Sequence, residues 1–369
     1  MKTETELEIF LVCVPGFETV LRAEAIEKGF KKPTCSQGGV TIRGGWSVAW
    51  RANLELRGAS KVLVRIATFK VQHLSQLDRR AHDVDWQALL QPEGTVRVEA
   101  SCKKSKIYHQ KAAAERIAKA ISDTTGAKIS DDGELVIKAR IFEDHCTISI
   151  DTSGTALHKR GSKEALNKAP MRETLAALLL RSCGYQGSEP VVDPMCGSGT
   201  FVIEAAEIAA KKKAGRHRHF AFEQLITFDA DLWARMKAKD ISIKPEPHFY
   251  GFDRDPGAID RSRANAERAD VLDDCTFTNQ PISALKAPNG PTGLIIINPP
   301  YGVRIGEIKK LSNLYQSLGQ VLKDEFTGWR VGLVTSADKL AKSTGLAFDD
   351  NTLAFSHGGI KVKLYQAQL

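Results

Sequence analysis

The sequence predicts an α/β protein in which a doubly wound, mostly parallel sheet follows two smaller α+β modules. From residue 170 onward, short apolar strands such as GLIIIN at Gly293 alternate with helical stretches. Strands without polar alternation are typical of a parallel sheet that helices cover on both faces. Before residue 152, strands and amphipathic helices follow one another in shorter units. A stretch rich in Gly, Ser, Lys, Arg and His separates the two parts.

The length of 369 residues accommodates two to three domains at roughly 150 residues each. We expect one module over 1–65, a second over 66–152, a linker over 153–168 and the large domain over 169–369. Hydrophobic residues at 42% and charged residues at 26% exclude disorder and collagen-like repeats. A net charge of +8 is compatible with a polyanionic partner.

The elements are predicted from apolar periodicity and β-branched content. In the first module we expect strands over 8–14, 40–43 and 61–69 and a helix over 17–28. In the second we expect helices over 85–90 and 105–122 and strands over 95–100, 135–142 and 145–150. In the large domain the strands begin near Val191, Phe249, Gly293 and Val331.

Several classes of protein are excluded by what the sequence lacks. No apolar run approaches the ~20 residues that cross a bilayer, and the acidic start MKTETELEIF does not resemble a signal peptide, so we expect a cytoplasmic protein. The seven cysteines contain no C-x-x-C pair, which fits neither a disulfide framework nor a zinc site. We therefore expect no metal and no membrane partner.

A glycine loop is the sharpest motif in the chain. The strand at Val191 ends in Asp193, a Gly-Ser-Gly turn follows, and a helix begins. Ligands of open α/β sheets bind beyond the carboxyl ends of the strands, Gly197 and Gly199 permit close approach, and the helix amides suit a carboxylate. Asp193 adds a negative charge suited to an ammonium or to ribose hydroxyls, so a ligand with a carboxylate and an amine fits better than a pyrophosphate. Val202 stands where a dinucleotide motif has its third glycine, which disfavours a nicotinamide site. The alternative is a plain strand-to-helix connection. The candidate cofactor residues here are Asp193, Met195, Cys196, Gly197, Ser198, Gly199 and Thr200.

Two further strand ends carry polar groups. Asp253, at the tip of the next strand, is placed to accept hydrogen bonds from ribose hydroxyls, with Arg254 beside it. Asp255, followed by Pro256, is expected to cap a helix, and capping is also the alternative for Asp253.

The motif Asn298-Pro299-Pro300-Tyr301 interrupts the strand that precedes it. Prolines hold the Asn298 amide and the neighbouring carbonyls out of regular pairing. If Asn298 and the Pro299 carbonyl accept the two hydrogens of an exocyclic amine, its nitrogen can attack an electrophile without a strong base. Tyr301 would stack on the extracted base, which is worth about 1–3 kcal/mol. The alternative is a simple turn that ends the strand.

These motifs resemble those of the class I S-adenosylmethionine-dependent methyltransferases that modify exocyclic amino groups. The shared residues are the D-P-x-C-G-S-G loop from Asp193 and the N-P-P-Y sequence from Asn298. The resemblance implies a Rossmann-like catalytic domain with S-adenosylmethionine as cofactor. It also implies that Asn298 contributes to the cofactor site, and that the catalytic residues are Asn298, Pro299, Pro300 and Tyr301.

Other segments resemble the THUMP-containing RNA guanine-N2 methyltransferases, closest to the bacterial family that acts on 23S rRNA. They are residues 157–161, 169–177, 220–223 and 228–229, and the Y-G-V-R-I-G sequence from Tyr301. The resemblance implies a ferredoxin-like module over 1–65 and an RNA-gripping THUMP domain over 66–152. Pro281 replaces the acid expected to contact the adenine amine, so Asn279, Gln280, Ser283 or a backbone group must serve, and Val303 replaces a glutamate.

If RNA is the partner, two groups of basic residues are candidates for contacts with its phosphates. A run of charged residues is more often simply a solvent-exposed face. These RNA-binding candidates are Lys103, Lys104, Lys106, His109, Lys111, Lys159 and Arg160. The predicted reaction is methylation of a guanosine N2, in 23S rRNA first and in tRNA second. The alternatives are an adenine-N6 methyltransferase acting on nucleic acid and an inactive RNA-binding or ribosome-assembly factor.

Overall fold

The computed structural model describes residues 6–161, 171–239, 241–301 and 305–369. Residues 162–168 of the predicted linker, and Val303, lie outside this part of the chain. The protein divides into two compact units. The first comprises Met1–Cys13, Leu21–Leu157 and Arg218–Asp240, and the second comprises Val14–Val20, His158–His217 and Ile241–Leu369.

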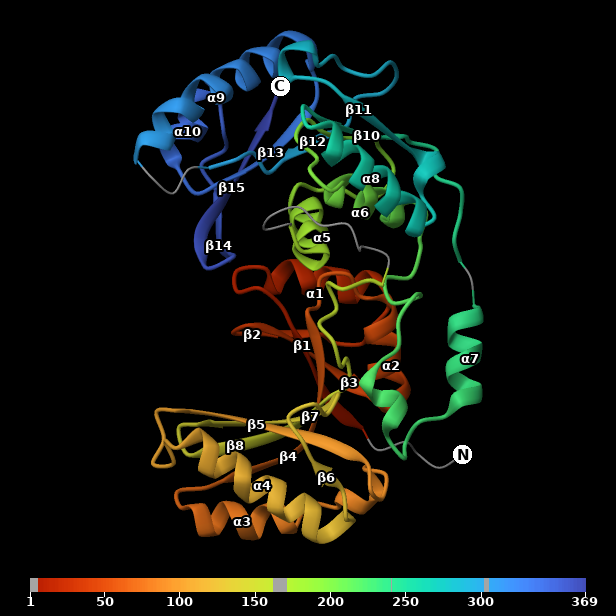
Figure 1. Cartoon of the computed structure of the whole chain (residues 1–369), viewed down its shortest axis with the longest axis vertical. Helices are drawn as coiled ribbons and strands as arrows, with labels where there is room; N and C mark the ends of the chain where they lie inside the picture. The colour runs from red at the N-terminus through yellow and green to blue at the C-terminus, as the bar shows by residue number, and fades with distance from the viewer. Residues whose placement is uncertain (1–5, 162–170, 240, 302–304) are drawn as a thin grey trace. The chain divides into compact units, whose positions relative to one another are not determined.

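The first unit is built on one eight-stranded sheet with the order β2-β3-β1-β4-β8-β7-β5-β6. Its strands are β1 (Leu7–Val12), β2 (Thr34–Ser36), β3 (Gly39–Gly44), β4 (Lys61–Lys70), β5 (Thr95–Lys103), β6 (Lys128–Ile129), β7 (Leu135–Phe142) and β8 (His145–Asp151). The two predicted α+β modules share this sheet, because β4 pairs antiparallel with β1 on one side and with β8 on the other. Helices α3 (Leu74–His82) and α4 (Gln110–Thr125) lie side by side on it (Figure 1).

Several helices of the first unit differ from the prediction. α1 (Glu18–Glu27) is confirmed, but α2 (Trp46–Glu55) and α3 were not predicted. The helix expected over 85–90 is a single 3₁₀ turn, η1 (Trp86–Ala88), which Asp85 caps by accepting a hydrogen bond from the Ala88 amide.

The predicted helix over 105–122 begins five residues later than expected, at Gln110. Hydrogen bonds outside the helix hold the intervening backbone. Ser105 Oγ donates to the Lys103 carbonyl, and the Lys106 amide donates to Asp144.

The second unit contains a seven-stranded sheet with the order β11-β10-β9-β12-β13-β15-β14, in which every strand except β15 runs in the same direction. The strands are β9 (Val191–Asp193), β10 (Phe249–Asp253), β11 (Cys275–Asn279), β12 (Leu294–Ile297), β13 (Arg330–Thr335), β14 (Leu353–His357) and β15 (Ile360–Gln368). Every residue of β9 and β12 is buried, as the predicted parallel sheet requires. The order along the sheet reverses between β9 and β12, which makes their carboxyl ends the expected ligand site.

Helices of the second unit form two contacting groups. One group is α5 (Glu173–Ser182), α6 (Thr200–Ala209) and α8 (Pro256–Arg268), and the other is α9 (Ile305–Glu325) and α10 (Asp338–Ser343) (Figure 1). The predicted doubly wound α/β class is therefore confirmed. Among the described residues, no helix combines the length and the apolar character needed to cross a membrane.

One segment of the predicted large domain packs within the first unit instead. It carries η2 (Ala221–Gln224) and α7 (Ala230–Ala238). Phe222 stacks on Trp50 with ring centroids 5.6 Å apart and meets Trp233 edge-on at 5.0 Å. Burial of these large aromatic side chains holds the segment in the first unit. Apolar periodicity along the sequence does not reveal such contacts.

Candidate active site

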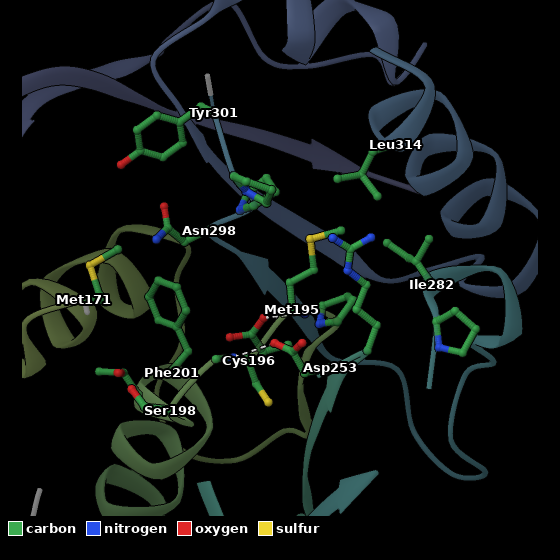
Figure 2. Close-up of a pocket in the computed structure, with 18 of the residues that line it drawn as sticks. Met171, Met195, Cys196, Ser198, Phe201, Asp253, Ile282, Asn298, Tyr301 and Leu314 are labelled. Atoms are coloured by element: carbon green, nitrogen blue, oxygen red, sulfur yellow. Dashed lines mark hydrogen bonds between the residues drawn. The ribbon is translucent and has the colours of Figure 1, made fainter. Parts of the chain in front are cut away.

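A pocket of about 750 Å³ opens at the carboxyl ends of β9, β10, β11 and β12 in the second unit (Figure 2). With the exception of Gly199, it is lined by every predicted cofactor and catalytic residue. They are Asp193, Met195, Cys196, Gly197, Ser198, Thr200, Asp253, Arg254, Asn298, Pro299, Pro300 and Tyr301. Four strands thus bring together residues that are more than a hundred positions apart in the chain.

The glycine loop between β9 and α6 forms one wall of the pocket. Gly197 and Gly199 have φ angles of +58° and +79°, in the left-handed region that favours glycine. The Gly197 amide donates to Asp253 Oδ2 at 3.0 Å, and Asp253 Oδ1 accepts from the Asp255 amide at 2.9 Å. Asp253 therefore joins the glycine loop to the start of α8, and the predicted cap by Asp255 with Pro256 is confirmed.

Two residues of α8 support the loop by hydrogen bonds, and neither was predicted from the sequence. Ser262 Oγ donates to the Gly197 carbonyl at 3.1 Å, and Asn265 Nδ2 donates to the Ser198 carbonyl at 3.1 Å. Both side chains are buried. In the sequence they appear only as two polar residues three positions apart on one helix. That pattern is equally common on exposed helix faces, so it does not mark them.

Asp193 brings an acid into the pocket wall. The residue is only 2% exposed, and its Oδ1 accepts a hydrogen bond from the Met195 amide at 3.0 Å. Burial raises the pKa of this carboxyl to about 8, with the Met195 hydrogen bond opposing the shift and Asp253 adding to it. A positively charged ligand group beside Asp193 would favour the ionised form.

Asn298 follows β12 and points its side chain into the pocket. Its Oδ1 is buried and has no hydrogen-bond partner among the described residues. An orphaned buried acceptor costs about 1–3 kcal/mol unless a donor reaches it. Figure 2 shows the amide between Tyr301 on one side and Phe201 and Met171 on the other. The wall thus combines an unmatched acceptor with flat and apolar side chains.

Tyrosine hydroxyls secure the backbone and the ring that follow Asn298. Tyr315 Oη lies 3.3 Å from the Pro300 carbonyl oxygen and 3.2 Å from Thr335 Oγ1. Tyr301 Oη lies 3.2 Å from His357 Nδ1. Burial raises the pKa of Tyr301, and it raises the pKa of Tyr315 to about 12, so both hydroxyls keep their protons. Tyr315 was not predicted as a site residue. Its spacing from Leu318 and Leu322 is that of a residue on the core-facing side of a helix.

The far end of the pocket lies beyond β11. Gln280, Pro281, Ile282 and Ser283 line it, next to Asp253. The Asn279 side chain is engaged elsewhere, since its amide donates to the Asp253 carbonyl at 2.9 Å. Of the side chains predicted to replace the missing acid, Gln280 and Ser283 therefore face the pocket.

Most of the predicted RNA-contacting residues are exposed, and one is not. Arg160 is buried, and its guanidinium forms an ion pair with Glu204 at 3.1 Å. The structure therefore corrects the prediction for Arg160, because a cation enclosed with its counter-charge is not presented to a phosphate. Lys159 is exposed. In the part of the chain that is described, no group of His, Cys, Asp and Glu side chains is arranged to hold a metal ion.

The strand order, the glycine loop, the acid at the tip of β10 and the N-P-P-Y wall define a class I methyltransferase. The chain belongs to the RMKL-like methyltransferase family, whose domain matches residues 160–363. An RlmL ferredoxin-like domain matches residues 8–63 and a THUMP domain matches residues 71–151. The predicted resemblance is confirmed at this level, and S-adenosylmethionine is the cofactor.

Several similar proteins match this chain over nearly its whole length. A putative RNA methyltransferase from Synechocystis sp. is 30% identical, over 98% of this chain and 96% of that protein. The structure of SMU.472, a putative methyltransferase complexed with SAH, is 27% identical with a TM-score of 0.88, over 100% and 99% of the two chains. A predicted N6-adenine-specific DNA methylase from Listeria monocytogenes is 26% identical with a TM-score of 0.88, over 98% and 96%.

The residues that line the pocket fit this cofactor. The left-handed Gly197 leaves open space where a Cβ would stand, so the backbone permits close approach of a ligand. Asp193 and Asp253 place carboxyl groups in the pocket wall, where an ionised Asp193 would suit an ammonium group and Asp253 would suit ribose hydroxyls. The apolar Ile282 would suit an adenine ring at the far end.

We expect S-adenosylhomocysteine to bind more tightly as the pH rises from about 6 toward about 8, by up to about tenfold per pH unit. Its ammonium pairs with ionised Asp193, whose raised pKa keeps it protonated below about 8. The same raised pKa means that stability of the ligand-free protein falls as pH rises from about 4 through about 8. Calorimetric titration of the wild type and of Asp193→Asn tests the effect. Equal pH dependence in both proteins would remove Asp193 from this role.

Proposed function

We propose that this methyltransferase acts on the exocyclic N2 of a guanosine in RNA, with 23S rRNA as the substrate and the cytoplasm as its location. The observation that carries the proposal is the unpartnered, buried Asn298 Oδ1 in the pocket wall. An exocyclic amine of a nucleobase carries two hydrogens, one of which it can donate to this oxygen while the other meets a second acceptor. The THUMP domain over residues 71–151 and the likeness to a putative RNA methyltransferase support RNA as the substrate. The motifs from Tyr301 onward support guanine.

When bound, S-adenosylmethionine supplies a methyl group already activated by its sulfonium charge. The residues of the chain then have to position the acceptor. Asn298 Oδ1 and the Pro299 carbonyl accept the two amine hydrogens, so that electron density concentrates on the nitrogen. The Pro300 carbonyl, 3.3 Å from the Tyr315 hydroxyl, ties the proline turn to α9. No side chain has to remove a proton before the nitrogen attacks, and the methylated nitrogen then releases one proton to solvent.

The target base must leave its stack to reach Asn298, at a cost of a few kcal/mol. Tyr301 recovers about 1–3 kcal/mol of this cost by stacking on the base. The contact between Tyr301 and His357 at the end of β14 restrains the ring. The Tyr301 ring therefore acts as a fixed stacking surface for the base, and its protonated hydroxyl contacts His357.

Other substrates share the chemistry of the same wall. An adenine N6 amine would meet Asn298 equally well, and the Listeria relative carries that specificity in its name. A guanosine in tRNA differs from one in rRNA only outside the pocket. These alternatives change the product or the RNA that carries it, so product analysis separates them.

We expect nucleoside mass spectrometry to find N2-methylguanosine in RNA incubated with the protein and S-adenosylmethionine. In cells, the modification should be present at a 23S rRNA guanosine when the gene is intact and absent when it is deleted. N6-methyladenosine as the product, or a modified tRNA with unchanged rRNA, would replace the proposal by the corresponding alternative. Failure to bind millimolar S-adenosylmethionine by calorimetry would indicate an inactive RNA-binding factor.

A further inference from the structure

The hairpin of β14 and β15 contributes one wall of the candidate active site (Figure 1). At its tip, His357, Gly358 and Ile360 line the pocket. Gly358 and Gly359 form the turn with φ angles of +58° and +82°, and two positive φ angles are typical of a tight two-residue hairpin turn. The pairing of His357 with Ile360 closes this turn. Because the turn fixes the register of both strands, the tip is held or displaced as one piece.

The tip of the hairpin projects beyond the part that the sheet holds. β13 pairs with β15 from Lys363 to Gln368, whereas the pairing of β14 with β15 continues to Ile360. In this outer part Phe355 and Val362 are opposite each other, and both are buried. Among the described strands, pairing with β13 therefore ends before the tip. Packing of side chains has to hold the tip in place.

A buried aromatic side chain from the start of the sequence packs on this tip. Phe17 belongs to Val14–Val20, a segment of the second unit, and it is fully buried. Its ring meets the Phe355 ring edge-on, with the centroids 5.1 Å apart. A Cβ added at the neighbouring Gly16 would lie 3.8 Å from Leu353 Cδ1, so the turn before α1 lies directly against β14. An edge-to-face aromatic pair stabilises this contact beyond the area that it buries.

The same face of β14 carries the contact with the N-P-P-Y turn. Side chains alternate between the two faces of a strand, so Leu353, Phe355 and His357 point to one side. His357 Nδ1 lies 3.2 Å from Tyr301 Oη. The contact that Phe17 makes and the contact that Tyr301 makes are therefore two residues, or about 7 Å, apart along one face of β14.

We propose that Phe17 is a positioning residue for methyl transfer. By packing on Phe355 it holds the hairpin tip, and through His357 the tip keeps the Tyr301 ring where the target base stacks. Phe17 is absent from the pocket wall, so it acts only through the hairpin. The inference rests on the proposed role of Tyr301 as the stacking surface, and it adds to the site a residue from the first twenty of the chain.

The test measures methyl transfer from tritiated S-adenosylmethionine by the full-length protein to total RNA from cells that lack the gene. Such RNA contains the unmodified target in rRNA and in tRNA alike. Phe17→Ala should lower kcat about tenfold, because displacement of an orienting group slows a reaction that depends on geometry. Affinity for S-adenosylhomocysteine, measured by calorimetry, should stay within about twofold of the wild type, as should the apparent KM for RNA. Phe17→Leu keeps an apolar side chain in the same place and should stay within about threefold of the wild-type kcat.

Phe30→Ala is the matched control, because Phe30 is also buried and lies outside the pocket wall. It should lower Tm as Phe17→Ala does and leave kcat at the wild-type value. Tyr301→Phe supplies a second background, since it keeps the ring and removes the hydroxyl that contacts His357. In that background Phe17→Ala should lower kcat by no more than about twofold, because the two changes interrupt the same route.

Equal losses of kcat for Phe17→Ala in both backgrounds, a wild-type kcat in Phe17→Ala, or an equal loss in Phe30→Ala would overturn the proposal. If Phe17→Ala does not fold, Phe17→Leu makes the same comparison, with a loss expected beside Tyr301 and none beside Tyr301→Phe. Nucleoside analysis of the product separates this proposal from the proposed function. A product other than N2-methylguanosine with the Phe17 effect intact overturns only the function. N2-methylguanosine formed by Phe17→Ala at the wild-type rate overturns only the positioning role.

Discussion

Asn298→Ala is expected to lower kcat for RNA methylation by at least about a hundredfold while S-adenosylmethionine binds with nearly unchanged affinity. The substitution removes the buried Oδ1 that has no partner among the described residues and that we assign to the amine hydrogens. The proline turn stays in place, because the Pro300 carbonyl keeps its contact with Tyr315. Transfer of label from a tritiated donor to RNA measures the rate, and calorimetry measures cofactor binding.

Asn289→Ala is the matched control for this variant. Asn289 is exposed, precedes β12 and is absent from the pocket wall. Its loss should leave both measurements at wild-type values. Turnover of Asn298→Ala equal to that of the wild type would eliminate the proposed catalytic role, and loss of cofactor binding would show that Asn298 serves the cofactor instead.

The second large effect is expected for Gly197→Val, which should weaken S-adenosylmethionine binding at least about a hundredfold, or roughly 2.8 kcal/mol. Gly197 lines the pocket at a φ of +58°, and no atom lies within 4 Å of an added Cβ. The valine methyl groups would therefore enter the space that the cofactor needs. Strain of a non-glycine residue in this region costs about 1–2 kcal/mol of stability besides.

Gly29→Val separates the loss of binding from the strain. Gly29 has a φ of +74° at the end of α1, also with open space around an added Cβ, and it lies outside the pocket wall. Both variants should lose similar amounts of thermal stability, measured as Tm. Only Gly197→Val should lose cofactor binding by calorimetry. Wild-type affinity in Gly197→Val would contradict the assignment of the glycine loop to the cofactor.

The motifs of the pocket were predictable because each one lies at the end of a strand. The sequence Asp193 to Thr200 specifies its own turn through glycine, and Asn298 to Tyr301 specifies its own through proline. Local chemistry of this kind needs no knowledge of distant residues. The apolar runs of β9 and β12 likewise indicate their burial directly.

The residues that support these motifs were not predictable. Tyr315 and His357 reach the N-P-P-Y turn from α9 and from the end of β14, and Ser262 and Asn265 hold the glycine loop from α8. Each has the spacing of an ordinary helix or strand residue. Their partners are defined by the order of strands in the sheet, which periodicity does not encode.

The linear chain thus specified the α/β class, the glycine turn after Asp193 and the proline turn after Asn298, because these depend on residue types at short spacing. The fold alone revealed that Arg160 forms an ion pair with Glu204 and that Phe222 stacks on Trp50. Ion pairs, aromatic packing and surfaces join residues far apart in the chain. Their geometry exists only after the strands have paired and the side chains have been buried.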